Sequence, residues 1–342
     1  MKVLVTGDRG YIGPILVNKL LEIGHEVVGI DTNFFSEPLI STEKPNYQQL
    51  IGDIRDIQSS QLSSFQSVIH LAGLSNDPLG ELNPNITDEI NFKATVNLAK
   101  QAKKAGVSRF VYASSQSIYG VSKVNDELDE DHSLKNPITE YAIAKWKSEQ
   151  VITPMNSSDF VVTCLRPATV FGASPNLRSD VVFNNMMACA YLTGNIEVKS
   201  DGTPLRPVVH VEDVSEAFIA GMLADGGVVG GRSYNVGIPN GNFTVRKIAE
   251  AVRDSIPGSK LVFTGEHVDS RSYKVSFDRI LTELGHLYKP KWDLEKGGQQ
   301  LLKFFQETNF KDSHFRGRST NRLSQIKHLI DSGSLSPDLR TV

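Results

Sequence analysis

The sequence predicts an α/β protein with a doubly wound parallel sheet, followed by a smaller, loop-rich C-terminal domain. Three observations predict this class. Short apolar runs alternate with helix-period stretches over residues 1–170, a glycine-rich turn directly follows the first apolar run, and Gly, Pro and Asn become frequent after Pro167. We expect a first domain at 1–170, with segments near 205–237 returning to it, a second at 171–310 and a tail at 311–342.

The expected strands are rich in Val and Ile and carry little charge, as strands buried on both faces should. They are Lys2–Thr6, Glu26–Ile30, Ser67–Leu71, Arg109–Ala113 and Phe160–Arg166. The expected helices between them are Ile12–Ile23, Ile90–Ala105 and Glu140–Ile152. The tail should hold one helix, Asn321–Ile330, which Gly333 would end. We expect this tail to dock on the body or on a neighbouring subunit, a mobile tail being the alternative.

Length and composition limit the classes of function that this chain can have. A chain of 342 residues is long enough to form two domains. Its composition, with 39% hydrophobic and 22% charged residues, is ordinary for a soluble globular protein. The net charge of −3 provides no basic field for nucleic acid or an anionic membrane. No apolar run approaches the ~20 residues that a membrane span needs. We therefore expect a soluble cytoplasmic protein with no nucleic-acid or membrane partner and no metal site.

The turn after the first expected strand has the spacing Gly-x-x-Gly-x-x-Gly, with Gly7, Gly10 and Gly13 around Tyr11 and Ile12. Glycines permit a tight turn and let the backbone approach a diphosphate. The helix that follows offers unpaired N–H groups and the positive end of its dipole to that anion. This arrangement predicts a dinucleotide site of the Rossmann type.

An acidic residue stands where such a site needs one. Asp31 ends the second expected strand, where a carboxylate would accept hydrogen bonds from the adenosine ribose hydroxyls. Because that charge would repel a 2′-phosphate, we expect NAD rather than NADP; the alternative is that Asp31 only caps the following turn. Two further segments fit the same pocket: Asp53 and Ile54 beside the adenine, and Leu71, Ala72 and Gly73 after the next strand.

Tyr141 and Lys145 lie one helical turn apart on the same face of an expected helix. A tyrosine of ordinary pKa, about 10, is a poor base at neutral pH, and an adjacent cation together with a nicotinamide ring favours its phenolate. A second copy of the pattern, Tyr119 to Lys123, starts at a Tyr-Gly pair and enters polar loop residues. Tyr141 is therefore the expected acid/base.

Ser115 directly follows an expected central strand. A hydroxyl at the carboxyl end of such a strand can bond a reacting alcohol or ketone, because open α/β sheets bind ligands there. The alternative is a strand-end hydroxyl that bonds its own backbone.

Together these motifs resemble the extended short-chain dehydrogenase/reductases, in the branch of NAD-dependent nucleotide-sugar epimerases and dehydratases. The resemblance covers roughly residues 1–290. The motifs that carry it are the glycine turn, Asp53, His70-Leu71-Ala72-Gly73, Ser114-Ser115, Ile118-Tyr119-Gly120, Tyr141-x-x-x-Lys145, Arg166-Pro167 and Arg206-Pro207-x-x-His210-Val211-x-Asp213. The tail matches nothing with a role that we can name.

The resemblance implies a role for each matching position. Ser115 would bond the reacting sugar oxygen, Tyr141 would be the acid/base, and Lys145 would support both Tyr141 and the nicotinamide ribose. Asn91 and Pro167 would face the cofactor. The 171–310 domain would bind a nucleotide-diphosphate sugar, and relatives dimerise through helices that match Ile90–Ala105 and Glu140–Ile152 here, so a homodimer is implied. The positions implied on the substrate side are Ser75, Ser115, Gln116, Arg206 and Arg271, the two arginines gripping the diphosphate.

The branches of this family differ after a shared first step, in which hydride leaves a sugar carbon for NAD. Dehydratases carry an Asp-Glu pair after the serine position, decarboxylases tend to carry a glutamate at the position of Ser117, and 3,5-epimerases carry a cysteine there. This chain has Gln116 and Ser117. Epimerisation through a transient 4-keto sugar, or reduction and oxidation at one carbinol, is what remains. The expected NAD preference favours the epimerase, and a non-catalytic NAD-binding protein is a third alternative.

Overall fold

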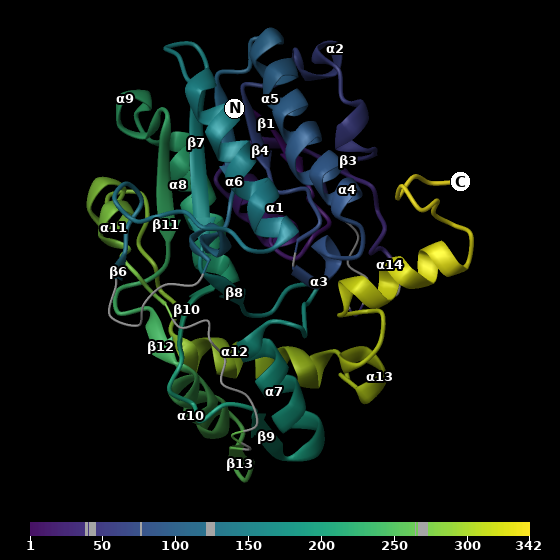
Figure 1. Ribbon diagram of the computed structural model, residues 1–342, viewed down its shortest axis with the longest axis vertical. Coiled ribbons are helices and arrows are strands. Elements are labelled where there is room, and N and C mark those ends of the chain that lie inside the picture. The colour runs from purple at the N-terminus through teal and green to yellow at the C-terminus, as the bar shows by residue number, and fades with distance from the viewer. Residues whose placement is uncertain (38–39, 41–45, 76, 121–126, 264, 266–272) are drawn as a thin grey trace.

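The computed structural model describes all residues except 38–39, 41–45, 76, 121–126, 264 and 266–272. Its centre is a seven-stranded parallel sheet in the order β11-β7-β5-β4-β1-β2-β3, which confirms the doubly wound fold (Figure 1). The strands are β1 (Lys2–Thr6), β2 (Glu26–Asp31), β3 (Gln48–Ile51), β4 (Ser67–His70), β5 (Arg109–Ala113), β7 (Val161–Pro167) and β11 (Arg232–Val236). The order of the strands along the chain reverses between β1 and β4. Sheets of this kind bind ligands at the carboxyl ends of the two strands that flank such a reversal, so the ligand site is expected beside β1 and β4.

The five expected strands form the interior of this sheet and β3 and β11 are its edges. Neither edge strand is among the strands expected from the sequence. The side chains of β3 are mostly exposed, so it lacks the apolar run that marks a strand covered on both faces. β11 lies far along the chain, in the segment expected to return to the first domain.

Helices cover both faces of the sheet, and the alternation of strand side chains assigns them to their faces. Val3 and Val5 pack in one apolar cluster with Leu16 and Phe218, from the first pair of helices. Leu4 packs in another cluster with side chains of the second pair. The first pair is α1 (Gly13–Glu22) and α8 (Val211–Leu223), and the second is α5 (Thr95–Lys104) and α6 (Glu140–Ile152).

The expected helix at 90–105 forms in two parts. A π-helical stretch, Asp88–Ala94, precedes α5. Asn91 lies in this wider stretch, where its side-chain oxygen accepts from the N–H of Leu74 at 2.7 Å and its amide donates to the carbonyl of Leu74 at 2.9 Å. The irregular turn thus fixes the loop after β4, in keeping with the frequent use of π-bulges at functional sites.

A smaller group of elements from the second half of the chain packs below the sheet in Figure 1 around its own apolar core, which includes Phe183, Ile248, Leu301 and Phe305. Its elements are α7 (Val182–Thr193), β9 (Asn195–Val198), α10 (Val245–Ser255), β13 (Lys260–Phe263) and α12 (Leu294–Glu307). Between the halves lie β8 (Thr169–Phe171), β10 (Leu205–His210) and β12 (Asn242–Thr244). Smaller elements are α2 (Ser59–Leu62), α3 (Asp77–Gly80), α4 (Pro84–Thr87), α9 (Gly226–Val229), α11 (Asp278–Glu283), β6 (Glu127–Leu128) and β14 (Lys274–Val275). Within the described residues, no helix is long and apolar enough to cross a membrane.

The tail docks on the sheet half of the same chain, where its yellow ribbon lies in Figure 1. It holds α13 (Asp312–Phe315) and α14 (Arg322–Asp331), and Asn321 caps α14 by accepting from the N–H of Ser324. Ile326 and Leu339 enter the apolar cluster that lies under α5.

A buried ion pair ties α6 to the sheet. Arg166 on β7 donates to both carboxylate oxygens of Glu149, the shortest contact being 2.6 Å, and the two side chains are only 3% and 2% exposed. Ser233 on β11 donates to the same carboxylate at 2.9 Å. The position of α6 therefore depends on charge compensation in the protein interior.

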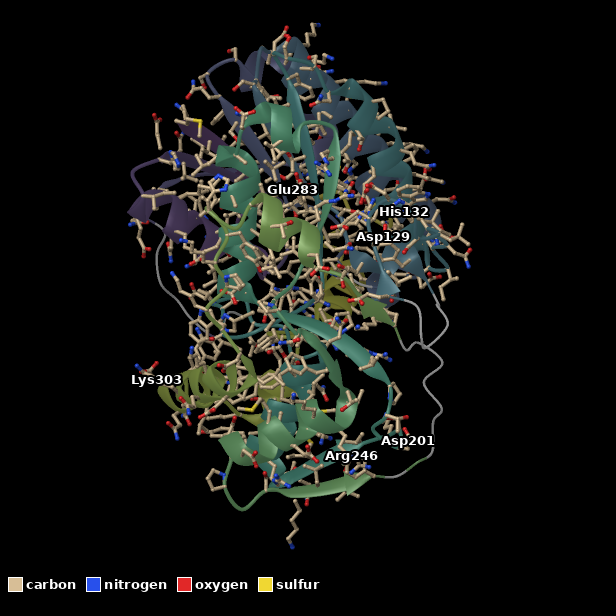
Figure 2. All side chains as sticks on the ribbon, turned by 90° about the vertical axis from the view of Figure 1, so that its left-hand side faces the viewer. Asp129, His132, Asp201, Arg246, Glu283 and Lys303 are labelled. Carbon is tan, nitrogen blue, oxygen red and sulfur yellow. The ribbon has the colours of Figure 1, made fainter. Side chains whose placement is uncertain are left out.

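We expect Glu149→Ala to lower the free energy of unfolding by about 3–5 kcal/mol, because it leaves the Arg166 guanidinium buried without its partner. Urea denaturation measures the loss. Glu307→Ala is the matched control: it removes the surface pair with Lys303, whose side chain points outward in Figure 2 and is 74% exposed. The control should show no measurable loss, and an equal effect of both variants would contradict the expectation.

Candidate active site

A cavity of about 830 Å³ opens at the carboxyl ends of β1, β2, β4, β5 and β7. It brings together residues that are far apart in the sequence and that come from both halves of the chain. Among the residues expected at the site, Gly7, Gly10, Tyr11, Ile12, Gly13, Asp31, Asp53, Ile54, Leu71, Ala72, Gly73, Ser75, Ser115, Gln116, Tyr141, Lys145, Pro167 and Arg206 line it. Asn91 does not line the cavity; its side-chain oxygen accepts a hydrogen bond from the backbone of Leu74, in the loop after β4. Arg271 lies outside the described residues.

The glycine turn has no space for a side chain at Gly7 or at Gly13. A Cβ on Gly7, whose φ is +75°, would lie 2.7 Å from the backbone nitrogen of Ala72. A Cβ on Gly13 would lie 2.4 Å from the carbonyl oxygen of Gly7. Helix α1 then begins with no side-chain cap and no acidic residue in its first turn, which suits an anion at its N-terminus. These residues fit a dinucleotide.

Asp31 marks one end of the cavity. One of its oxygens accepts from the N–H of Asn33 at 2.7 Å, which is the turn-capping role considered as the alternative. The residue also lines the cavity, and a carboxylate has enough lone pairs for both roles. Burial raises the pKa of Asp31 to about 6, and the nearby Asp8 carboxylate adds to the shift.

Asp53 is expected beside the adenine, and its carboxylate already has strong partners. Arg55 contacts it at 2.6 Å and Arg340, from the tail, at 3.3 Å. The carboxylate thus holds the loop in place, and Ile54, which is buried, presents the apolar surface next to it.

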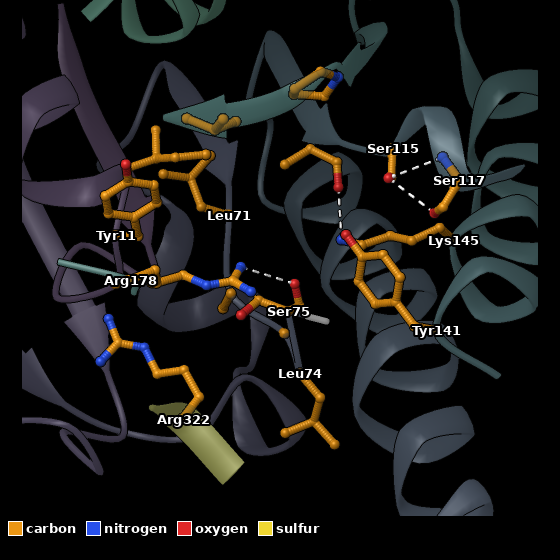
Figure 3. Close-up of a pocket in the computed structure, with 18 of the residues that line it drawn as sticks. Tyr11, Leu71, Leu74, Ser75, Ser115, Ser117, Tyr141, Lys145, Arg178 and Arg322 are labelled. Atoms are coloured by element: carbon orange, nitrogen blue, oxygen red, sulfur yellow. Dashed lines mark hydrogen bonds between the residues drawn. The ribbon is translucent and has the colours of Figure 1, made fainter. Parts of the chain in front are cut away.

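Tyr141, Ser115 and Lys145 meet at the opposite end of the cavity (Figure 3). Thr139 caps α6 by accepting from the N–H of Ala142, which places Tyr141 in the first turn of the helix. The ammonium of Lys145 lies 5.8 Å from the centre of the Tyr141 ring and donates to the carbonyl of Ala113 at 2.6 Å. Burial lowers the pKa of Lys145 to about 8.

Burial also raises the pKa of Tyr141, while the hydrogen bond with Ser115 and the charge of Arg178 act in the opposite direction. The sequence predicts Lys145 as the neighbouring cation that favours the phenolate. The charge of Arg178 acts in this direction, while the ammonium of Lys145 lies 5.8 Å from the ring centre and bonds the carbonyl of Ala113.

The rival pattern at Tyr119 lies outside the cavity. Tyr119 is 2% exposed, donates to Asn235 at 2.8 Å and accepts from Arg166 at 3.0 Å. Its partner in the pattern, Lys123, lies outside the described residues. The hydroxyl of Tyr119 therefore has a structural role in the interior.

The two residues after Ser115 provide no acid or base. The amide of Gln116 turns inward and donates to the carbonyl of Arg166 at 3.1 Å. Ser117 donates its hydroxyl to the Ser115 oxygen at 2.9 Å. Gln116 thus borders the cavity, but its amide nitrogen bonds the backbone of β7.

Two arginines line the cavity that the sequence does not identify as site residues. Arg178 follows β8 in a loop, pairs with Asp180 at 2.9 Å and donates to the carbonyl of Ser75 at 3.2 Å. Arg322 comes from the first turn of α14 in the tail. Sequence gives no signal for either, because loop geometry and tail docking bring them to the site.

Comparisons with known proteins identify relatives of this chain. The model of the NAD dependent epimerase/dehydratase family matches residues 3–237. The chain is 29% identical to a UDP-glucose 4-epimerase of Mycolicibacterium smegmatis over 90% of its own length and 99% of that protein. It is 30% identical to a UDP-glucose 4-epimerase of Neisseria gonorrhoeae over 69% of this chain and 78% of that one. The solved structure of MoeE5 in complex with UDP-glucuronic acid and NAD is 25% identical, with a TM-score of 0.76, covering 90% of this chain and all (100%) of that chain.

We expect the affinity for ADP-ribose, the adenosine-containing part of NAD, to fall roughly tenfold between pH 7 and pH 5. With a pKa of about 6, Asp31 is ionised at pH 7 and accepts from the ribose; at pH 5 it is mostly protonated and loses acceptors. Since the folded-state pKa is raised, the same protonation favours the folded protein, so unfolding at Asp31 would not explain the loss.

Calorimetric titration with ADP-ribose from pH 5 to pH 8 measures this profile. Asp31→Asn is the control, because it should bind more weakly and with a flat profile. A wild-type affinity that does not change with pH would exclude the role of this carboxylate.

Proposed function

The chain belongs to the NAD-dependent epimerase/dehydratase family, and from that premise we propose that it inverts one carbinol carbon, C4, of a nucleotide-diphosphate sugar. One observation carries the proposal. Ser115, Tyr141 and Lys145 meet in the cavity, whereas the side chains of Gln116 and Ser117 offer no group for dehydration or decarboxylation.

The substrate class is supported by the comparisons and by the cavity. The bacterial relatives act as UDP-glucose 4-epimerases, and MoeE5 holds UDP-glucuronic acid together with NAD. Arg206 enters the cavity from β10, on the side of the second half. A guanidinium there can bind the diphosphate of the substrate through paired hydrogen bonds.

Tyr141 and Ser115 divide the proton chemistry between them. The Tyr141 oxygen, as phenolate, takes the proton of the sugar hydroxyl, and the Ser115 hydroxyl bonds the same sugar oxygen as it becomes a carbonyl. NAD, when bound, would supply the acceptor and later the donor of the hydride at that carbon. When Tyr141 gives its proton back to the sugar oxygen and the carbon regains its hydrogen from the opposite face, the epimer forms with no net oxidation.

Arg178 and Ser115 favour the phenolate of Tyr141, whose pKa burial raises. Burial alone would keep Tyr141 protonated, and both groups oppose that effect. Lys145, bonded to Ala113 beneath Tyr141, would support the nicotinamide ribose.

A dehydrogenase or ketoreductase would use the same three side chains, but it must release its cofactor at each turnover. The tail favours retention: Gln325 donates to the carbonyls of Phe34 and Glu37, beside the Asp31 end of the cavity. A protein with that end held by its own C-terminal segment is suited to keep NAD through the cycle.

We expect Tyr141→Phe to lower the turnover of UDP-glucose, used as the probe substrate, at least 100-fold, because it removes the proton acceptor. Nuclear magnetic resonance of the sugar products measures turnover, and mass spectrometry of the denatured protein measures bound NAD, which should not change. Tyr191→Phe, on α7 outside the cavity, is the matched control.

Three results would count against the proposal. Activity retained in Tyr141→Phe would show that another group is the base. NADH that accumulates in step with product would identify a dehydrogenase. NAD bound by a protein that turns over none of a panel of nucleotide-diphosphate sugars would favour the non-catalytic alternative.

A further inference from the structure

The C-terminal segment 311–342 lies beyond the part of the chain that the family model matches. It nevertheless bridges loops on both sides of the cofactor cavity. Thr320 and Ser179 share a hydrogen bond of 2.6 Å on the side of the second half. On the side of the sheet, Arg55 donates to the carbonyls of Asp338 and Leu339 at 2.8 Å each.

Arg322 is the residue of this segment that reaches into the cavity. Figure 3 shows it rising from α14 on the same side as Tyr11 and Arg178, away from Tyr141. It is 2% exposed, its guanidinium lies 4.4 Å from the centre of the Phe35 ring, and one nitrogen donates to the carbonyl of Asn176 at 2.8 Å.

The charge of Arg322 is not compensated in the way that its neighbours are. Arg178 has an ion pair with Asp180. Within the described part of the chain, no carboxylate forms an ion pair with Arg322. Burial, and then the repulsion from Arg178, lower the pKa of Arg322 to about 10, so it is still a cation at neutral pH. A buried cation that has no carboxylate in ion-pair contact is costly, and an anion that binds it lowers this cost.

The position of Arg322 indicates which anion would compensate its charge. Its charge interacts with Asp180, which is already paired with Arg178, with Asp31, at the end of the cavity expected to hold the adenosine, and with Tyr11, in the glycine turn. Both the turn and Arg322 line the same cavity. The substrate side has its own arginine, Arg206, which arrives from β10.

We propose that Arg322 binds the diphosphate of NAD opposite the glycine turn, so that the C-terminal segment is part of the cofactor site. The glycine turn offers backbone N–H groups and a helix dipole to the anion, and Arg322 supplies a formal charge from the facing wall. The segment therefore couples its own docking to the binding of NAD. This role is independent of the reaction, since an epimerase and a dehydrogenase need the same cofactor.

Two ligands that differ in the diphosphate test the proposal. In Arg322→Ala we expect the dissociation constant for ADP-ribose to rise about 10- to 100-fold, the range for a hydrogen bond to a charged group. The dissociation constant for adenosine, which has no phosphate, should change less than about twofold. Lys327→Ala, an exposed cation on the same helix, is the matched control and should leave both values unchanged. Calorimetry gives the affinities, and the melting temperature of each variant without ligand reports on folding.

A purely structural role gives a different pattern. If Arg322 only holds Asn176 and Phe35, the alanine variant will melt earlier while its affinity for ADP-ribose stays within twofold of wild type. An equal loss for adenosine and ADP-ribose would show that Arg322 merely shapes the pocket. Either result overturns the proposal. Should Arg322→Ala not fold, Arg322→Lys keeps the charge and loses the planar fork, and it must still weaken ADP-ribose selectively.

Discussion

The close approach of two backbone turns underlies the site. The turn after β1 lies directly against the backbone that follows β4, with so little space at Gly7 that a single added carbon would meet the nitrogen of Ala72. That contact brings the N-terminus of α1 and the loop at Leu74 to one edge of the sheet, and it leaves the cavity between them. Asn91 maintains the second turn by bonding both backbone groups of Leu74. The shape of this end of the cavity therefore depends on backbone contacts and on Asn91, which does not line the cavity.

The catalytic end depends on a different interaction. Tyr141 and Lys145 belong to a helix whose other end is held by the buried pair of Glu149 and Arg166. Because Arg166 also bonds Tyr119, the rival tyrosine helps to position the helix that carries Tyr141. Charges buried for structural reasons and charges buried for chemistry thus share one network, and a change in the first will move the second.

Most of the fold and of the cofactor site could be predicted from local patterns. Buried strands, the glycine spacing and Asp31 have strong local signatures, and the structure brings these residues to one cavity. The edge strand β3 was missed because an edge has no apolar pattern to find. Arg178 and Arg322 were missed for another reason: a loop and a docked tail carry them in, and nothing near them in the sequence encodes the destination. Gln116 shows a third limit, because sequence places a residue at a site but does not tell which way its side chain turns.

The docking of the tail also has a consequence for the order of events during synthesis. Arg340 contacts Asp56 across a separation of 284 residues, and Gln325 contacts Phe34 across 291. Contacts between such distant parts of a chain form late, and residues 311–342 leave the ribosome after the residues that they contact. The strands of the sheet from β1 to β7 and the glycine turn can form while the rest of the chain, including the edge strand β11, is still being translated. The wall that we propose Arg322 adds forms only after residues 311–342 have left the ribosome, so the cofactor site would be completed later than the strands that carry the glycine turn.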